Sequence, residues 1–170
     1  MLLRHEKTLI TGAPGVGKTT LVQRIVDRME SVHLAGFYTA EMRSRGSRVG
    51  FELRGLNGER STLAHVEIHS RHRVGRYGVD TIGFEAFLET LDLLSPDVEL
   101  IVIDEIGKME LFSSRFRRLV LDVMSSDKGV LATIPMKGSQ FIREIKQRPD
   151  IHLFEVTHGN RDRLPEAILG

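Results

Sequence analysis

The sequence predicts an α/β fold of three layers, in which a mostly parallel central sheet lies between helices and carries an inserted antiparallel hairpin. Two observations lead to this prediction. Short apolar runs typical of buried strands alternate with segments of helical periodicity, and two strand-like segments in the middle flank an Asn-Gly turn signal. A length of 170 residues fits one domain over residues 1–170, and an apolar fraction of 41% suffices for its core.

The first part of the chain is predicted to open the parallel sheet. Thr8–Ile10 is an apolar run before a glycine-rich turn, which indicates a buried strand. From Lys18 to about Glu30 the apolar residues recur at helical spacing, and Leu34–Thr39 has the composition of a second strand. This strand–helix–strand order is typical of a right-handed parallel unit.

The middle of the chain is predicted to form the insertion, at about residues 43–80. Arg48–Leu53 and Arg60–Val66 flank Asn57-Gly58, so we expect an antiparallel hairpin. The polar and basic segment Glu67–Asp80 shows little periodicity, and we expect it to run over one edge of the sheet.

The second half of the chain returns to alternating helices and strands. Helical spacing runs from Thr81 to Leu94 and stops near Pro96, and Leu100–Ile103 is a continuous apolar run. The remaining predicted elements are a helix over Ser113–Ser125, a strand over Gly129–Ile134, a helix over Ser139–Lys146, a strand over His152–Val156 and a helix over Asn160–Leu169.

Charge and composition exclude several classes of protein. The formal net charge of +1 argues against a surface built as a whole to hold nucleic acid. The stretch from Arg43 to Arg76 is nevertheless basic, with eight Arg and three Glu, and is either a solvated face or a surface that attracts phosphates. The chain has no cysteine, signal peptide or membrane-length apolar run, so we expect a cytoplasmic protein without membrane contact.

The strongest motif is a phosphate-binding loop, the P-loop or Walker A motif. Gly12–Thr19 matches G-x-x-x-x-G-K-[ST] and lies between a predicted strand and a predicted helix. Its backbone N–H groups and the helix N-terminus suit phosphate oxygens, Lys18 is placed to reach the β- and γ-phosphates, and the Thr19 hydroxyl is a Mg²⁺ ligand. The predicted nucleotide-binding residues are Gly12, Ala13, Pro14, Gly15, Val16, Gly17, Lys18, Thr19 and Thr20.

A second motif follows the strand Leu100–Ile103. Asp104 fits the Walker B role of holding Mg²⁺, because it ends a buried strand at the edge where ligands bind in such sheets. Glu105 is then placed to orient and deprotonate an attacking water. A carboxylate beside the metal favours hydrolysis, whereas a kinase needs an acceptor pocket and a mobile lid.

Other residues are candidates for supporting roles. Lys108 follows a flexible glycine and is the first candidate for offsetting charge on the transferring phosphoryl group, with Arg43 and Arg76 as competitors. Asn160 is a candidate for hydrogen bonding to the base and for capping the last helix, and Arg161 is a candidate for stacking on the base.

These motifs together resemble a known family, the small nucleoside-triphosphatases of thermophilic prokaryotes and their cancer-related relatives in animals. The resemblance covers nearly the whole chain and rests most on the P-loop and on Asp104–Leu111. Supporting matches are Gly36–Arg43, Val74–Asp80, Thr133–Pro135 and Asn160–Asp162. The family implies a RecA-like core that hydrolyses nucleoside triphosphates with Mg²⁺ and broad base tolerance.

The sequence therefore predicts a Mg²⁺-dependent nucleoside-triphosphatase acting on ATP, GTP, CTP and UTP, expected to be a monomer without a nucleic-acid partner. Its predicted catalytic residues are Glu105, Lys18 and Lys108, and its predicted metal ligands are Thr19 and Asp104. Two alternatives stay open. One is a small nucleoside or nucleotide kinase, and the other is a nucleotide-driven switch or nucleic-acid-binding ATPase that uses the basic stretch from Arg43 to Arg76.

Overall fold

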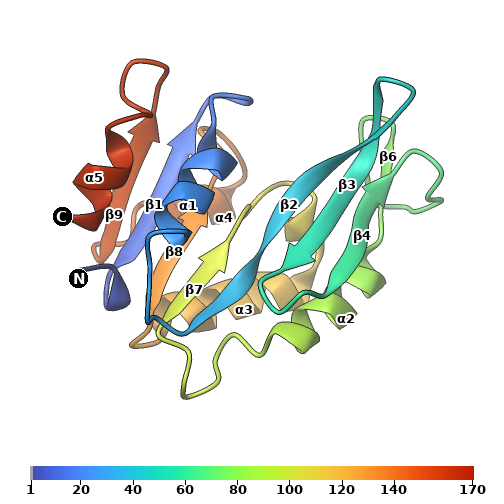
Figure 1. The fold of residues 1–170 in the computed structure, drawn as a ribbon. Coiled ribbons are helices and arrows are strands. Elements are labelled where there is room, and N and C mark those ends of the chain that lie inside the picture. The colour runs from blue at the N-terminus through green and yellow to red at the C-terminus, as the bar shows by residue number, and fades with distance from the viewer. Residues whose placement is uncertain (1) are drawn as a thin grey trace.

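The computed structural model describes residues 2–170, and in this range the strands form one mixed sheet of nine strands with helices on both faces (Figure 1). The strand order is β5-β6-β4-β3-β2-β7-β8-β1-β9. One half of the sheet is parallel and the other half is antiparallel, which confirms the predicted fold class.

The parallel half holds five strands in the order β2-β7-β8-β1-β9. Its strands β1, β7 and β8 are buried on both faces, and successive residues of a strand point to opposite sides of the sheet. In β7, Ile101 and Ile103 pack on one face while Leu100 and Val102 pack on the other. The five strands are β1 (Lys7–Gly12), β2 (Leu34–Ser44), β7 (Leu100–Ile103), β8 (Gly129–Thr133) and β9 (Ile151–Val156).

Helices cover the two faces as separate layers (Figure 1). Helices α1 (Lys18–Val26) and α5 (Leu164–Leu169), with the 3₁₀ turn η1 (Leu2–Arg4), pack on one face. Helices α2 (Thr81–Leu91), α3 (Ser114–Ser125) and α4 (Gln140–Lys146) pack on the other, where a second 3₁₀ turn, η2 (Glu110–Phe112), precedes α3. The predicted three-layer arrangement is thus confirmed.

The antiparallel half extends the sheet beyond β2. Residues Leu34–Phe37 of β2 pair with β7. From Phe37 to Ser44 the strand pairs with β3. Strands β2 and β3 extend beyond the end of β7 (Figure 1). The strands of this half are β3 (Ser47–Gly55), β4 (Arg60–His65), β5 (Arg73–Val74) and β6 (Tyr77–Val79).

Two expectations for the middle of the chain need correction. The second strand was expected to end at Thr39, but it runs to Ser44 because β3 supplies backbone partners for its outer half. The segment Glu67–Asp80, predicted to run over one edge of the sheet, instead forms that edge, because its β5–β6 hairpin pairs with β4. The predicted hairpin of β3 and β4 is confirmed.

The last helix starts later than predicted. Helix α5 begins at Leu164, and its N-cap residue is Arg163 rather than Asn160. The Asn160 side chain instead holds the preceding turn, because it accepts a hydrogen bond from the Thr157 amide at 2.8 Å and donates one to the Glu155 carbonyl at 2.9 Å. The expectation that Asn160 caps the last helix is therefore wrong.

Candidate active site

The predicted motifs meet at one edge of the parallel half of the sheet. The P-loop follows β1, Asp104 and Glu105 follow β7, and the segment Ile134–Lys137 follows β8. These three strands are hydrogen-bonded neighbours and run parallel, so the residues after their carboxyl ends converge. The motifs are far apart in the sequence, and they meet because their strands are neighbours in the sheet.

The P-loop has the backbone shape that phosphate binding requires. Gly17 has φ 108° at the N-cap of α1, a conformation that favours glycine, and it gives the helix no side-chain cap. The first N–H groups of α1 are therefore open to an anion at the positive end of the helix dipole. Gly12 lies against β9, where an added Cβ would meet the Val156 carbonyl oxygen at 2.8 Å.

The Lys18 ammonium lies inside this loop. Its Nζ donates to the Gly12 carbonyl at 2.8 Å and to the Ala13 carbonyl at 3.3 Å. Both contacts hold the positive charge at the centre of the loop, close to the carboxylates that follow β7. The side chain is therefore placed where phosphate oxygens would replace or share these carbonyl contacts.

The Asp104 carboxylate is almost fully buried and is held by hydroxyl groups. Its side chain is 3% exposed, Thr19 Oγ1 donates to Oδ2 at 2.7 Å, and Thr133 Oγ1 donates to Oδ1 at 2.6 Å. Thr39 Oγ1 also donates to the Asp104 carbonyl at 2.6 Å. Burial raises the pKa of Asp104, while the two hydroxyls and the Lys18 charge act in the opposite direction.

The donor atoms of Thr19 and Asp104 fit Mg²⁺. Both are oxygens, they lie 2.7 Å apart, and they sit beside a loop shaped for phosphate. In the described part of the chain no group of three or more His, Cys, Asp or Glu side chains is arranged to hold a metal ion alone. This agrees with the usual way in which Mg²⁺ is bound, through one or two protein oxygens, waters and substrate phosphates.

The Glu105 carboxyl lies half-buried at the wall of the P-loop cavity. Burial raises its pKa, the charge of Lys18 lowers it, and the negative charge of Asp104 raises it. A second carboxyl, that of Glu110, is buried on the far side of Gly107. The site thus contains one carboxyl facing the cavity and another behind it.

The cavity around the P-loop has a volume of about 610 Å³ and holds most of the predicted residues. Pro135, Met136 and Lys137 form its third wall, and sequence analysis assigned no side chain there a role. The signal that could have found them is their place directly after β8. The lining residues are Gly12, Pro14, Gly15, Gly17, Lys18, Thr19, Thr20, Glu105, Pro135, Met136 and Lys137.

Lys146 on α4 contacts both this third wall and strand β1. Its ammonium donates to the Met136 carbonyl at 2.9 Å and reaches the Thr11 hydroxyl at 3.5 Å. Burial lowers the pKa of Lys146, and the charge of Glu155 raises it. The loop that carries Lys137 is therefore fixed relative to β1.

The three candidates for offsetting phosphoryl charge lie outside this lining. Lys108 is exposed on the loop after Gly107. Arg43 pairs with Glu41 at 2.8 Å, and Arg76 stacks on the Tyr77 ring with its guanidinium carbon 5.4 Å from the ring centroid. Both arginines belong to the antiparallel half of the sheet, where these contacts engage their side chains.

The predicted base-contacting residues lie on the other side of the P-loop. The Arg161 guanidinium reaches the Val16 carbonyl at 3.5 Å, and Arg161 lines a small cavity together with Gly17 and Thr20. Asn160 has its amide engaged by the backbone of its own turn. Arg161 is therefore the member of the pair whose side chain faces the loop.

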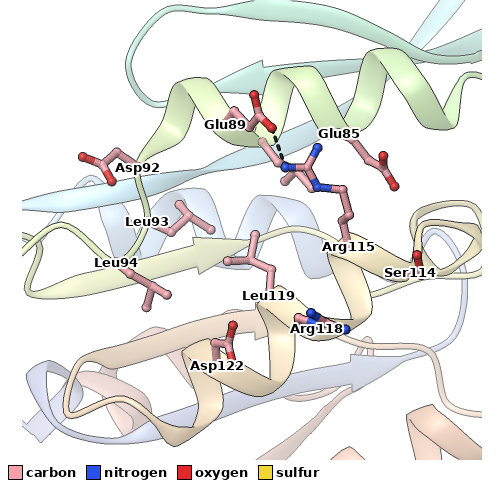
Figure 2. Close-up of a pocket in the computed structure, with 11 residues that line it drawn as sticks. Glu85, Glu89, Asp92, Leu93, Leu94, Ser114, Arg115, Arg118, Leu119 and Asp122 are labelled. Carbon is pink, nitrogen blue, oxygen red and sulfur yellow. Dashed lines mark hydrogen bonds and ion pairs between the residues drawn. The ribbon is translucent and has the colours of Figure 1, made fainter.

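A second cavity lies between α2 and α3 and is shown in Figure 2. It has a volume of about 510 Å³, leucines line it, and Glu89 on α2 pairs with Arg115 on α3 at 2.5 Å. No residue of the P-loop or of the run Asp104–Leu111 is among its described lining residues. We therefore assign the candidate chemistry to the P-loop cavity.

Comparison with known proteins agrees with this geometry. Residues 7–169 match the protein family described as NTPase. The chain belongs to the NTPase family. It is 43% identical over 164 residues to the nucleoside-triphosphatase THEP1 of Thermotoga sp. (strain RQ2), covering 96% of this chain and 93% of that protein. It is 40% identical to the human cancer-related nucleoside-triphosphatase, again with 96% and 93% coverage.

Solved structures of NTPase family members share the fold. The crystal structure of THEP1 from Aquifex aeolicus has a TM-score of 0.86 and 39% identity, over 95% of this chain and 96% of that one. The solution structure of the human cancer-related protein has a TM-score of 0.83 and 37% identity, over 96% and 95%. The resemblance to this family is thus confirmed. In the part of the chain that the structure describes, no helix is both long and apolar enough to span a bilayer.

Proposed function

We propose that this NTPase family member hydrolyses nucleoside 5′-triphosphates to diphosphates and phosphate. The observation that carries the proposal is the shared cavity of Lys18, Thr19 and Glu105, with Asp104 hydrogen-bonded to Thr19 at its base. A phosphate-binding loop, a pair of oxygen donors for a cation and a carboxylate facing the same space are the parts that phosphoryl transfer to water needs. The names of the related nucleoside-triphosphatases support this reaction.

The P-loop residues bind and orient the triphosphate. The open N–H groups at the start of α1 and the Lys18 ammonium neutralise the phosphate oxygens, and Gly12 and Gly17 let the backbone approach them closely. Thr19 and Asp104 would hold Mg²⁺, which would supply positive charge to offset the charge on the phosphate oxygens. Thr133 fixes the Asp104 carboxylate from behind.

Glu105 acts as the residue that orients and deprotonates water. Its carboxyl lines the cavity, and burial raises its pKa above that of an exposed glutamate. A carboxylate with a raised pKa is a stronger base, which favours removal of a proton from water at neutral pH. The water oxygen forms its bond to the γ-phosphorus while the bond from that phosphorus to the β–γ bridging oxygen breaks. The water proton passes to Glu105, and the nucleoside diphosphate leaves with the negative charge on its terminal oxygen.

A lysine offsets charge on the transferring phosphoryl group. Lys108 is one candidate and reaches the cavity if its loop closes over bound nucleotide. Lys137 is the other, because it already lines the cavity on a loop that Lys146 holds in place. A positive charge aimed at the developing negative charge lowers the barrier to transfer.

Base tolerance follows from which part of the substrate the site holds. The P-loop contacts phosphates, which all four common triphosphates share, and Arg161 offers a flat guanidinium that stacks on any base. We therefore propose turnover of ATP, GTP, CTP and UTP by a monomer, with no requirement for nucleic acid.

Phosphate release without an acceptor tests the reaction. Each triphosphate is incubated with Mg²⁺ or with EDTA, and phosphate and diphosphate are quantified together, with Lys18→Ala as the inactive control. Equal amounts of both products, formed only with Mg²⁺, are expected. Tight binding without release would contradict the proposal. Diphosphate formed without free phosphate after addition of a nucleoside would favour the kinase, and phosphate release only after addition of RNA would favour the nucleic-acid-dependent alternative.

A further inference from the structure

Glu110 is a buried residue whose carboxyl group has no role in the hydrolysis proposed above. It begins the turn η2 and is 4% exposed. The charges that act on it come from the carboxylates of Glu105 and Asp104, both of which disfavour its ionised form. A lone carboxylate is unfavourable in such surroundings, so its presence beside the reactive edge of the sheet requires an explanation.

The Glu110 carboxyl lies close to that of Glu105 across one glycine. A Cβ placed on Gly107 would lie 2.3 Å from Oε1 of Glu105 and 2.8 Å from Oε2 of Glu110. Both carboxyl groups therefore occupy the space that any other residue at 107 would fill with its side chain. Gly107 thus provides the gap in which the two glutamates approach each other.

Local hydrogen bonds fix the Glu110 side of this pair. The backbone amides of Glu110 and Gly107 lower the pKa of the Glu110 carboxyl, against the larger effect of its burial. The surrounding turn is fixed as well, since the Leu111 amide donates to the Gly107 carbonyl at 3.0 Å and the Ser113 side chain caps α3. Glu110 is therefore buried in a hydrogen-bonded turn, while Glu105 lines the cavity.

The protonation of Glu110 suits contact with a second carboxyl. Burial and the charge of Glu105 raise the pKa of Glu110 to about 8, so at neutral pH it carries a proton. A neutral carboxylic acid can donate a hydrogen bond to a neighbouring carboxylate, whereas two carboxylates at this separation repel each other.

We propose that Glu110 is a positioning residue for hydrolysis: its buried carboxylic acid holds the Glu105 carboxylate toward the phosphate cavity, across the gap that Gly107 provides. The inference rests on the proposed function, because it gives Glu105 the role of activating water. Glu110 itself contacts neither nucleotide nor water and acts through Glu105.

Three variants and one control test this role by steady-state kinetics and by equilibrium nucleotide binding. Glu110→Gln keeps a neutral hydrogen-bond donor of the same size, Glu110→Ala removes it, and Gly107→Ala fills the gap. The control is Glu85→Gln on α2, whose carboxyl accepts a hydrogen bond from Ser113 at 2.7 Å and lies outside the P-loop cavity lining. Circular dichroism and thermal unfolding establish that each variant is folded.

Glu110→Ala and Gly107→Ala are expected to lower kcat by about tenfold or more, because a misdirected Glu105 no longer meets the water, while nucleotide Kd stays near that of the wild type. Glu110→Gln is expected to retain most of the wild-type kcat at pH 7. The wild-type kcat is expected to fall as the pH rises through about 8, where Glu110 loses its proton, and this decline is expected to disappear in Glu110→Gln. Wild-type kcat in folded Glu110→Ala, or an unchanged alkaline decline in Glu110→Gln, would overturn the proposal.

A second readout separates failure of this inference from failure of the proposed function. Carbon-detected NMR of the nucleotide-free protein follows the ionisation of Glu110 in the wild type and in Glu105→Gln. If the two carboxyls form a pair, Glu110 titrates near pH 8 in the wild type and at lower pH when the charge of Glu105 is removed. An unchanged Glu110 titration would overturn the pairing whether or not the wild type releases phosphate.

Discussion

Asp104 is a single residue whose buried carboxyl group is held by hydrogen bonds. Its carboxylate is 3% exposed, and hydroxyl groups from α1 and β8 each donate to one of its oxygens. Buried charge of this kind is unfavourable unless it is hydrogen-bonded or paired with a cation. The two threonine hydroxyls therefore oppose the rise in pKa that burial causes, which would favour the ionised form that the proposed Mg²⁺ site needs.

Sequence alone could predict the residues of the site that lie in contiguous motifs. The P-loop and Asp104-Glu105 each follow a recognisable strand, so their position at the carboxyl edge follows from the fold. Lys137 also follows a predicted strand, β8, but it belongs to no recognised motif, so only the position of β8 between β7 and β1 assigns it to the cavity. Glu110 was not predictable either, since its burial depends on how the turn after Gly107 folds back.

Lys137 and Lys108 form a matched pair for testing which charge assists the reaction. We expect Lys137→Ala to lower kcat by about 10²-fold, because it removes a charge that already lines the cavity. Lys108→Ala is expected to have the smaller effect, because its side chain is exposed outside that lining. Steady-state phosphate release measures both, and a larger loss in Lys108→Ala would assign the role to a loop that closes on the nucleotide.

At the scale of elements, Phe37 joins the two halves of the sheet. It is the last residue of β2 that pairs with β7 and the first that pairs with β3. Its ring is fully buried and packs edge-on against Phe84 and Phe87 of α2 and Phe116 of α3. The Phe37 side chain therefore packs against both α2 and α3 at the junction of the parallel and antiparallel halves of the sheet.

Phe37→Ala is expected to lower the free energy of unfolding by about 3–5 kcal/mol, because it leaves a cavity in this aromatic cluster. Chemical denaturation measures the change. Ile82→Ala, at a side chain that is 81% exposed, is the control and should change the free energy by less than about 0.5 kcal/mol. Equal effects of the two substitutions would show that the cluster does not support the junction.

The elements that sequence missed share a physical cause. The outer half of β2 and the strand β5 consist of half-buried and exposed residues, so their apolar periodicity is weak. Strand β6 is buried, but its three residues are too few to show a periodicity. The buried strands β1, β7 and β8 were predicted within two residues at either end, because their apolar runs are filled on both faces. The start of α5 shifted because Asn160 stabilises a turn instead of a helix end.

For the whole molecule, Glu110 makes stability depend on pH. Burial raises the pKa of this carboxyl from 4.5 to about 8, so between these values the folded state keeps a proton that the unfolded chain releases. The free energy of unfolding therefore contains a contribution that falls as the pH rises from about 4.5 to about 8, by at most about 5 kcal/mol. Above about pH 8 this contribution is fully lost, because the buried Glu110 carboxyl is then ionised.

Denaturation curves of the wild type and of Glu110→Gln between pH 5 and pH 9 measure this contribution. The variant is expected to gain stability relative to the wild type as the pH rises, because its amide does not ionise. Glu85→Gln is expected to follow the wild-type curve. If the free energies of unfolding of the wild type and Glu110→Gln change with pH in the same way, Glu110 does not hold its proton in the folded state.

The central claim is that Glu105 activates water for hydrolysis of a triphosphate held by the P-loop. The most direct measurement compares single-turnover phosphate release and nucleotide Kd for the wild type and Glu105→Gln with Mg²⁺. Release is expected to slow by about 10²–10⁴-fold while Kd changes little, since the variant keeps the phosphate contacts and loses only the base. Release at the wild-type rate by Glu105→Gln would contradict it, because the water would then be activated by another group.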